Sequence, residues 1–196
     1  MIVGRSPLKT IRRVALFAPA ALLLAVPLTS CKAQETAEAQ EASDIPQGPV
    51  ADRADIIPQV AEQALDAKLR GYFERSGTAI IVATLPTLGG EPIDKVAFET
   101  FNRWGIGDAK TNRGLLVLVA PNERKMRIEV GCGLEKPITS DFAKQVIEQQ
   151  MVPQFRSGDY VTGIESGVHS LVEKLDTATE FGPTSEVCLK IMKRAA

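Results

Sequence analysis

The chain has 196 residues, which is room for one ordinary domain with extensions. With 44% hydrophobic and 24% charged residues its composition is that of a globular protein, which excludes wholesale disorder and a fibrous repeat. The net charge of −1 argues against nucleic-acid binding through a broad basic surface, so no nucleic-acid partner is expected. The only histidine, His169, excludes a multi-histidine metal site within one chain.

Residues 1–30 have the pattern of an export signal. Four basic and no acidic residues precede an apolar stretch at 14–28. Two prolines interrupt this stretch, and it is shorter than the about 20 apolar residues that a membrane-spanning helix needs. The segment ends in Leu28-Thr29-Ser30-Cys31, which resembles the lipobox of bacterial lipoproteins. We therefore expect a signal peptide that is cleaved before a lipidated Cys31; the alternative is an ordinary signal peptide with an incidental cysteine.

The expected location is the bacterial cell envelope, with the chain attached to a membrane by lipid and facing the periplasm. Lys32 follows the cysteine in place of the aspartate that favours inner-membrane retention, so the outer membrane is slightly favoured. Residues 31–49 are rich in Ala, Gln and Glu and predict a flexible acidic tether. Without residues 1–30 the chain carries 19 basic and 24 acidic residues, a net charge of −5.

The first half of the domain alternates helix and strand. Apolar residues at a spacing near 3.6 predict a helix over 58–75, with Asp55 as its cap and Pro58 in its first turn. Residues 78–84 are β-branched and apolar and predict a buried strand. A second helix is expected over 93–104; Trp104 at its end is interpreted as a core anchor, with a ligand-stacking platform as the alternative.

The second half begins with strands. Residues 114–120 predict a buried strand, and the alternation of Met126, Ile128 and Val130 after a turn predicts an antiparallel partner. The crossover helix between 78–84 and 114–120 makes those two strands parallel. Two further helices should begin at Thr139 or Ser140 and at Asp159.

These elements predict an α/β (α+β) fold of three layers, a small mixed sheet flanked by helices. The domain should cover residues 50–178, followed by a tail, 179–196. That tail either docks as a short helix near 185–193 or frays.

Familiar catalytic motifs are absent from the sequence. It contains no GxSxG, no GxxxxGK[ST] and no HExxH. His169 borders the apolar stripe of the last domain helix, which favours a surface position over a catalytic base. The spacing from Cys188 to Arg194 matches Cys-x₅-Arg, but the residues between are too large for a phosphate-cradling loop.

Oxygen-bearing side chains near strand and helix ends are better candidates for a site. Hard oxygen ligands from several loops suit Ca²⁺ or Mg²⁺, and ligands often bind at strand ends in layered folds. The alternative is that several of these side chains only cap helices. The candidates are Asp52, Asp55, Asp108, Asn112, Glu135, Ser140 and Asp141.

If Cys31 carries lipid, two cysteines remain, Cys132 and Cys188. An oxidising periplasm would allow a disulfide between them, but the sequence does not show whether their Cα atoms come within about 7 Å. Pairing is left open.

Four stretches, in order, resemble the TPM-domain family. They are VADRAD at 50–55, WGIG at 104–107 running on to Asn112-Arg113-Gly114 and its strand, RIEVGCG at 127–133, and PQFRSGDY at 153–160. The resemblance covers about residues 50–175. It implies a sheet flanked by helices and an exported or membrane-attached protein. A plant thylakoid member is described as an acid phosphatase, some members bind Ca²⁺, and another relative is an auxiliary subunit of an ion channel.

By position, the resemblance implies ion ligands at Asp52 and Asn112, and the ligand set that we expect is Asp52, Asp55, Asn112 and Asp141. Three departures weaken it: Arg113 is inserted before Gly114, Cys132 replaces a tyrosine, and Ser140 replaces an aspartate, with Asp141 one residue later. One residue along a helix turns a side chain by about 100°.

Two functions follow from these observations. The first is a lipid-anchored accessory protein of the envelope that assists membrane proteins or complexes and binds a divalent cation. The alternative is a divalent-metal-dependent acid phosphatase acting on phosphomonoesters, with Asp52 or Asp141 as the catalytic carboxylate.

Overall fold

The computed structural model describes residues 45–195 of the chain. The predicted export signal, the lipidation site Cys31 and the tether up to residue 44 lie outside this range. Between residues 45 and 195, no helix is both long enough and apolar enough to cross a membrane.

Four strands form one mixed sheet in the order β1-β2-β3-β4. The strands are β1 (Val50–Asp52), β2 (Ala79–Thr84), β3 (Gly114–Ala120) and β4 (Lys125–Val130). β1 and β3 run parallel to β2, and β4 pairs antiparallel with β3. The predicted parallel crossover and the predicted hairpin are therefore confirmed. No sequence pattern indicates β1 as a strand, because three residues are too few to show a period of two.

The central strand β3 is buried along its whole length, and its two faces belong to different cores. Leu115, Val117 and Val119 pack into the larger core, whereas Leu116 and Leu118 pack into the smaller one. Since successive side chains of a strand point to opposite faces, a strand buried on both sides needs helices on both sides.

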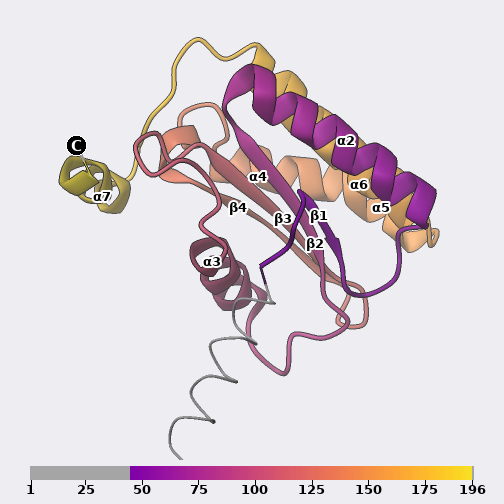
Figure 1. The fold of residues 1–196 in the computed structure, drawn as a ribbon. Helices are drawn as coiled ribbons and strands as arrows, with labels where there is room; N and C mark the ends of the chain where they lie inside the picture. Colours follow the sequence, from indigo (N-terminus) through magenta and orange to yellow (C-terminus); the bar gives the residue numbers. More distant parts are fainter. Residues whose placement is uncertain (1–44, 196) are drawn as a thin grey trace, which may run out of the picture. The chain divides into compact units, whose positions relative to one another are not determined.

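The helices form the two outer layers of a three-layer domain (Figure 1). α3 (Ile93–Arg103) covers the smaller core, where Ala97 and Phe101 contact the sheet. The larger core lies under α2 (Gln59–Ser76), α4 (Ser140–Val146), α5 (Val152–Arg156) and α6 (Tyr160–Asp176). The predicted fold class, a small mixed sheet flanked by helices, is confirmed.

Two helix starts agree with the sequence and one does not. Thr139 accepts a hydrogen bond from the Phe142 N–H at the start of α4, and Asp159 accepts one from the Thr162 N–H at the start of α6. Asp55, however, is not the cap of α2. Pro58 occupies that position without a side-chain hydrogen bond, and Asp55 lies in the preceding loop with φ 52°.

Between α4 and α5 the helix continues through one wide turn, η2 (Ile147–Met151), in which the Val152 N–H bonds to the Ile147 carbonyl. Pro153 gives the physical reason, because it has no N–H to donate and its ring would clash with the carbonyl four residues back in a regular α-helix. The turn places Met151 against α6, where a Cβ on Gly167 would lie 2.8 Å from the Met151 Cγ. A glycine at 167 therefore lets the two helices approach.

Candidate functional site

Asp52 lies at the carboxyl end of β1, and both of its carboxylate oxygens bind the protein itself. Oδ1 accepts the hydroxyl proton of Thr84, and Oδ2 accepts the Ile57 N–H at 2.7 Å. The Thr84 hydroxyl also accepts the Ala54 N–H at 2.9 Å, and Thr84 is fully buried. Asp52 therefore links β1, β2 and the loop before α2. Like a helix cap, this carboxylate has a structural role, because it accepts hydrogen bonds from the protein itself.

Asn112 lies near the other end of the sheet, just before β3. Its backbone has φ 49°, a conformation that asparagine tolerates better than most residues. The Asn112 carbonyl accepts the Gly133 N–H at 3.0 Å. A Cβ on Gly133 would overlap the carbonyl oxygen of Thr111, so only glycine allows this approach. The backbone of Asn112 thus supports a close contact between two loops.

Asp141 lies in a third place, in the first turn of α4 beside β4. It is exposed, and its carboxylate makes no hydrogen bond or ion pair within residues 45–195. β4 and β1 are the two opposite edges of the sheet. Three strand spacings of about 4.8 Å separate those edges.

The predicted cation site made of Asp52, Asp55, Asn112 and Asp141 is therefore not formed. Asp52 is level with Thr84 and Val119, whereas Asn112 precedes Gly114 at the start of the same strand. The five residue steps from Gly114 to Val119 alone span roughly 16 Å, and Ca²⁺ holds its oxygen ligands at about 2.3–2.6 Å. Within the described part of the chain no three His, Cys, Asp or Glu residues come together in a way that could hold a metal ion. The donors that the family resemblance implies do not fit one ion.

The other candidates also have structural explanations. Asp108 accepts the N–H groups of Lys110 and Thr111, and the bond from Thr111 is the main reason that the pKa of Asp108 lies below its usual value. Ser140 is exposed at the start of α4. His169 is exposed on α6, as expected for a surface histidine. Trp104 ends α3 and packs against the smaller core, which agrees with a core anchor.

A groove of about 730 Å³ runs between β4 and α4. β4 forms its strand wall from Met126 to Val130, and α4 with the turn before it contributes Ile138 to Lys144. Charged side chains lie along it: Arg127 bonds to both Asp94 (2.8 Å) and Glu129 (3.2 Å). Burial raises the pKa of Glu129, although Arg127 works against that shift.

β4 is an edge strand, so half of its backbone groups have no strand beside them. The Gly131 N–H bonds to the Gly114 carbonyl at 2.8 Å, which fixes the alternation along the ladder. Met126, Ile128 and Val130 then direct their N–H and C=O groups away from β3 and toward the groove. The open edge escaped prediction because the sequence does not show the order of strands in a sheet.

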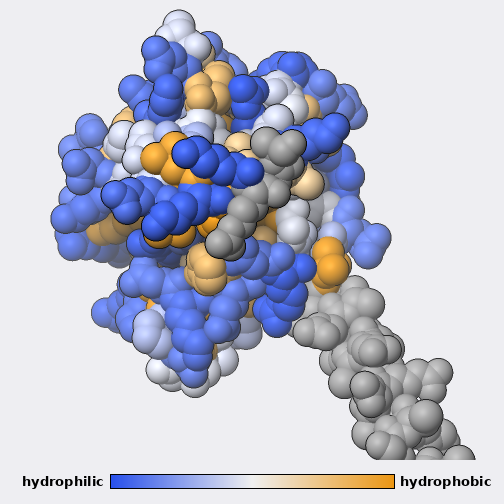
Figure 2. All heavy atoms as spheres, turned by 90° about the vertical axis from the view of Figure 1, so that its left-hand side faces the viewer, coloured by the Kyte–Doolittle hydropathy of each residue, from blue (hydrophilic) through white to orange (hydrophobic). Residues whose placement is uncertain are grey.

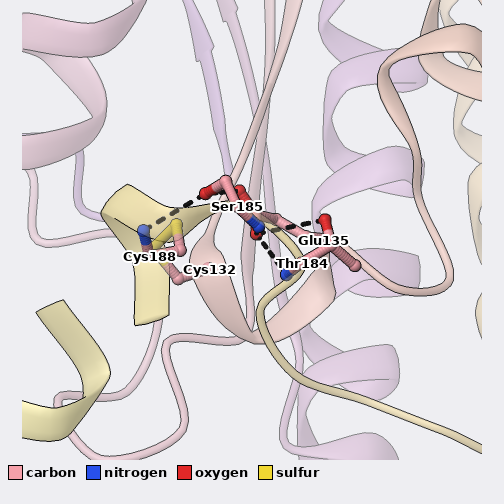
Figure 3. The surroundings of a disulfide bond; sticks show 5 residues. All are labelled: Cys132, Glu135, Thr184, Ser185 and Cys188. Atoms are coloured by element: carbon pink, nitrogen blue, oxygen red, sulfur yellow. Dashed lines mark hydrogen bonds between the residues drawn. A yellow bond between two sulfur atoms is a disulfide. The ribbon is translucent and has the colours of Figure 1, made fainter. Parts of the chain in front are cut away.

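The region around Cys132 is the other feature that the sequence left open. Cys132, in the short helix η1 (Cys132–Leu134), forms a disulfide with Cys188 of the terminal helix α7 (Glu186–Ala195), with 5.2 Å between the Cα atoms. Figure 3 shows Glu135 beside this bond, turned toward the residues that precede α7. Its Oε2 accepts the N–H groups of Thr184 (2.6 Å) and Ser185 (2.8 Å), and its Oε1 accepts the Ser185 hydroxyl.

Glu135 is therefore a clamp for the tail rather than an ion ligand. Burial alone would raise the pKa of Glu135, but the hydrogen bonds from Ser185 and Thr184 outweigh burial and lower it. Sequence reasoning missed this role, because a partner 49 or 50 residues away leaves no local signal.

Comparison with known proteins identifies the family. The model of the TPM domain matches residues 50–174. The chain belongs to the TPM-domain family. The matched residues run from β1 almost to the end of α6, so the open groove beside β4 is part of the TPM domain, whereas α7 lies beyond the match. No curated protein matches the chain.

Three solved structures resemble this TPM domain. The N-terminal domain of a protein from P. gingivalis is 29% identical with a TM-score of 0.64, over 74% of this chain and 92% of that one. The N-terminal domain of the cg2496 protein from Corynebacterium glutamicum is 14% identical with a TM-score of 0.52, over 70% and 87%. The BA42 protein from Bizionia argentinensis is 19% identical with a TM-score of 0.55, over 67% and 88%. At their identities the last two show the fold alone.

Proposed function

We propose that this TPM-domain protein is a lipid-anchored accessory module of the bacterial envelope that holds an extended segment of a membrane protein or envelope complex. One observation carries the proposal: the outward backbone groups of β4 line a groove with α4. An extended peptide placed there would add a strand to the sheet, with main-chain hydrogen bonds giving affinity and side-chain pockets giving specificity. Arg127 and Glu129 beside the groove would select the segment by charge.

Attachment at Cys31 supplies the location. The lipobox-like Leu28-Thr29-Ser30-Cys31 supports lipidation, and Lys32 after it supports the outer membrane, with the domain facing the periplasm. From Cys31 to Ile45 the chain can span at most about 50 Å, so the domain would stay near the bilayer. A disulfide between Cys132 and Cys188 is compatible with an oxidising compartment.

The alternative, an acid phosphatase, would rest on Asp141. Asp52 has both oxygens engaged, whereas Asp141 is exposed and lines the groove between β4 and α4. A phosphatase test is therefore a test of Asp141. Phosphate release from a chromogenic monoester, with and without added Ca²⁺ or Mg²⁺, should be equal for the wild type and Asp141→Asn. Release that is abolished by Asp141→Asn would favour the phosphatase.

The accessory role is tested by blocking the edge of β4. The lipoprotein is cross-linked in envelope membranes and purified as the wild type, Met126→Pro and Ser140→Trp. Proline at 126 removes an N–H that points into the groove while leaving the ladder to β3, and tryptophan at 140 fills the groove from α4. Val60→Ser is the matched control, because Val60 is 80% exposed on α2.

We expect a cross-linked partner that is recovered with the wild type and Val60→Ser but lost with both groove variants. Circular dichroism checks that Met126→Pro still folds, and Ser140→Trp keeps the test valid if it does not. Recovery of the same partner with Ser140→Trp at the wild-type level would overturn the proposed docking at β4.

A further inference from the structure

The terminal helix α7 has more apolar surface than the domain covers. Cys188 is buried against the domain, but Val187, Leu189 and Ile191 are 67%, 42% and 46% exposed. At 100° per residue, Val187, Ile191, Cys188, Met192 and Leu189 follow one another around the helix over about half of its circumference. The domain covers the middle of this apolar arc, at Cys188, and leaves its two edges exposed to solvent. Val187 and Ile191 lie at one edge, and Leu189 lies at the other. Figure 2 faces the side of the molecule that carries α7 and shows hydrophobic spheres exposed among hydrophilic ones.

The charge of α7 is opposite to that of the rest of the chain. The helix contains three basic residues and one acidic residue, whereas residues 31–185 contain 16 basic and 23 acidic residues. Lys190 and Lys193 are exposed on the polar side of the helix, next to the apolar arc. A short helix that combines an apolar face with flanking lysines has the chemistry of an interfacial helix on an anionic membrane.

α7 is held in a fixed orientation rather than left as a frayed end. The disulfide joins it to η1, and the Ser185 hydroxyl accepts the Cys188 N–H at 3.1 Å at the start of the helix. The Arg113 guanidinium lies 4.0 Å from the centre of the Phe181 ring in the segment before it. Arg113 and Cys132, two of the positions where this sequence departs from the pattern of its family, thus both hold the tail.

The attachment point of α7 is at the same end of the sheet as the start of the described chain. Ile45 lines a pocket with Ala79, the first residue of β2, and with the turn after Trp104. Ala79 pairs with Gly114, whose carbonyl bonds to the residue before Cys132. The tether that is expected to begin at Cys31 therefore joins the domain at the end of the sheet that also carries α7.

We propose that α7 is a membrane-surface helix, which places the neighbouring side chains of Val187 and Ile191 at the boundary of headgroups and acyl chains of an anionic bilayer, with Lys190 and Lys193 near lipid phosphates. The proposal relies on the proposed attachment at Cys31 only to bring a bilayer near. A second copy of the chain fits this surface less well, since three partly exposed side chains fall short of the roughly 800 Å² per partner that stable dimers bury. A bilayer needs no complementary shape.

The test uses the mature chain, residues 31–196, with Cys31→Ser, so that no acyl chain contributes. Flotation measures binding to vesicles of phosphatidylcholine alone and to vesicles with about 30% phosphatidylglycerol. We expect binding to the anionic vesicles only. Val187→Ser with Ile191→Ser should weaken it at least about tenfold, because two apolar side chains no longer enter the bilayer. Lys190→Gln with Lys193→Gln should weaken it by about tenfold or more, at about 1 kcal/mol for each lysine.

Val60→Ser and Phe98→Ser are the matched controls, since both side chains are apolar and at least 60% exposed but lie on α2 and α3. They should leave binding unchanged. Absence of binding to anionic vesicles, or an equal loss with the control variants, would overturn the proposal. Dimerisation that disappears with the Val187 and Ile191 double variant, without vesicle binding, would assign α7 to self-association instead. Mass spectrometry of the native lipoprotein tests acylation of Cys31 separately, so the two proposals can fail independently.

Discussion

Polar side chains at the two ends of the sheet have different partners. At the carboxyl end of β1, the Asp52 carboxylate accepts hydrogen bonds from Thr84 and Ile57, both within the TPM domain, and links neighbouring elements. At the opposite end, Glu135 and Cys132 bind a segment about 50 residues later in the chain. The first arrangement stabilises the domain itself, whereas the second adds an element, α7, that lies beyond the matched TPM domain. Two of the carboxylates that the sequence offered as site candidates, Asp52 and Glu135, thus serve different structures, the first the domain itself and the second the added helix.

The strongest way to test this contrast is to remove the disulfide. Cys132→Ser with Cys188→Ser frees a loop of 56 residues in the unfolded chain, which in the chain-entropy model lowers the free energy of unfolding by about 4 kcal/mol. Urea unfolding followed by Trp104 fluorescence measures the change, with the wild type in reducing agent as the control. A change below about 1 kcal/mol would show that α7 does not unfold together with the domain.

Removal of the Asp52 carboxylate should have the next largest effect. Asp52→Ala leaves the buried Thr84 hydroxyl and the Ile57 N–H without their acceptor, which costs about 1–3 kcal/mol of stability. Asp55→Asn is the control: Asp55 is exposed, and asparagine tolerates its positive φ, so a change below about 0.5 kcal/mol is expected. Thermal unfolding of both variants measures the two losses of stability. Equal destabilisation would contradict the role of Asp52 as the acceptor that links these elements.

The smallest effect is the pH dependence of the clamp at Glu135. The pKa of Glu135 is lower in the folded protein than in the unfolded chain. The contribution of Glu135 to the free energy of unfolding is therefore fully present when the pH is above the pKa that Glu135 has in the unfolded chain. This contribution to stability is lost as the pH falls through the pKa that Glu135 has in the folded protein. The NMR shift of the Ser185 amide should titrate with a midpoint below about 4.3, the ordinary value for glutamate. Glu135→Gln should abolish that titration, and a midpoint at or above the ordinary value would contradict the clamp.

The fold was predictable because its signals are local. The unbroken apolar run at 114–120 indicates a strand buried on both faces, and Thr139 and Asp159 mark helix starts by their own capping chemistry. β1 was not predictable, since its three residues are held in the sheet by pairing with β2 rather than by a pattern of their own.

The site could not be derived in the same way. Asp52, Asn112 and Asp141 all follow or precede regular elements, and the sequence does not show which end of the sheet each one faces. The register of β2 with β1 and β3 decides that, and it separates Asp52 from Asn112. Likewise Glu135 is an acidic residue in a loop until its partners at 184 and 185 are known.

Site-specific photocross-linking in the envelope tests most directly whether the groove beside β4 is the working surface of this protein. A photoreactive amino acid is placed at Ser140, in the groove, or at Val60, on the outer side of α2. We predict a cross-link to a discrete membrane or envelope protein from position 140 and none from position 60. A partner captured from position 60 but not from position 140 would contradict the account.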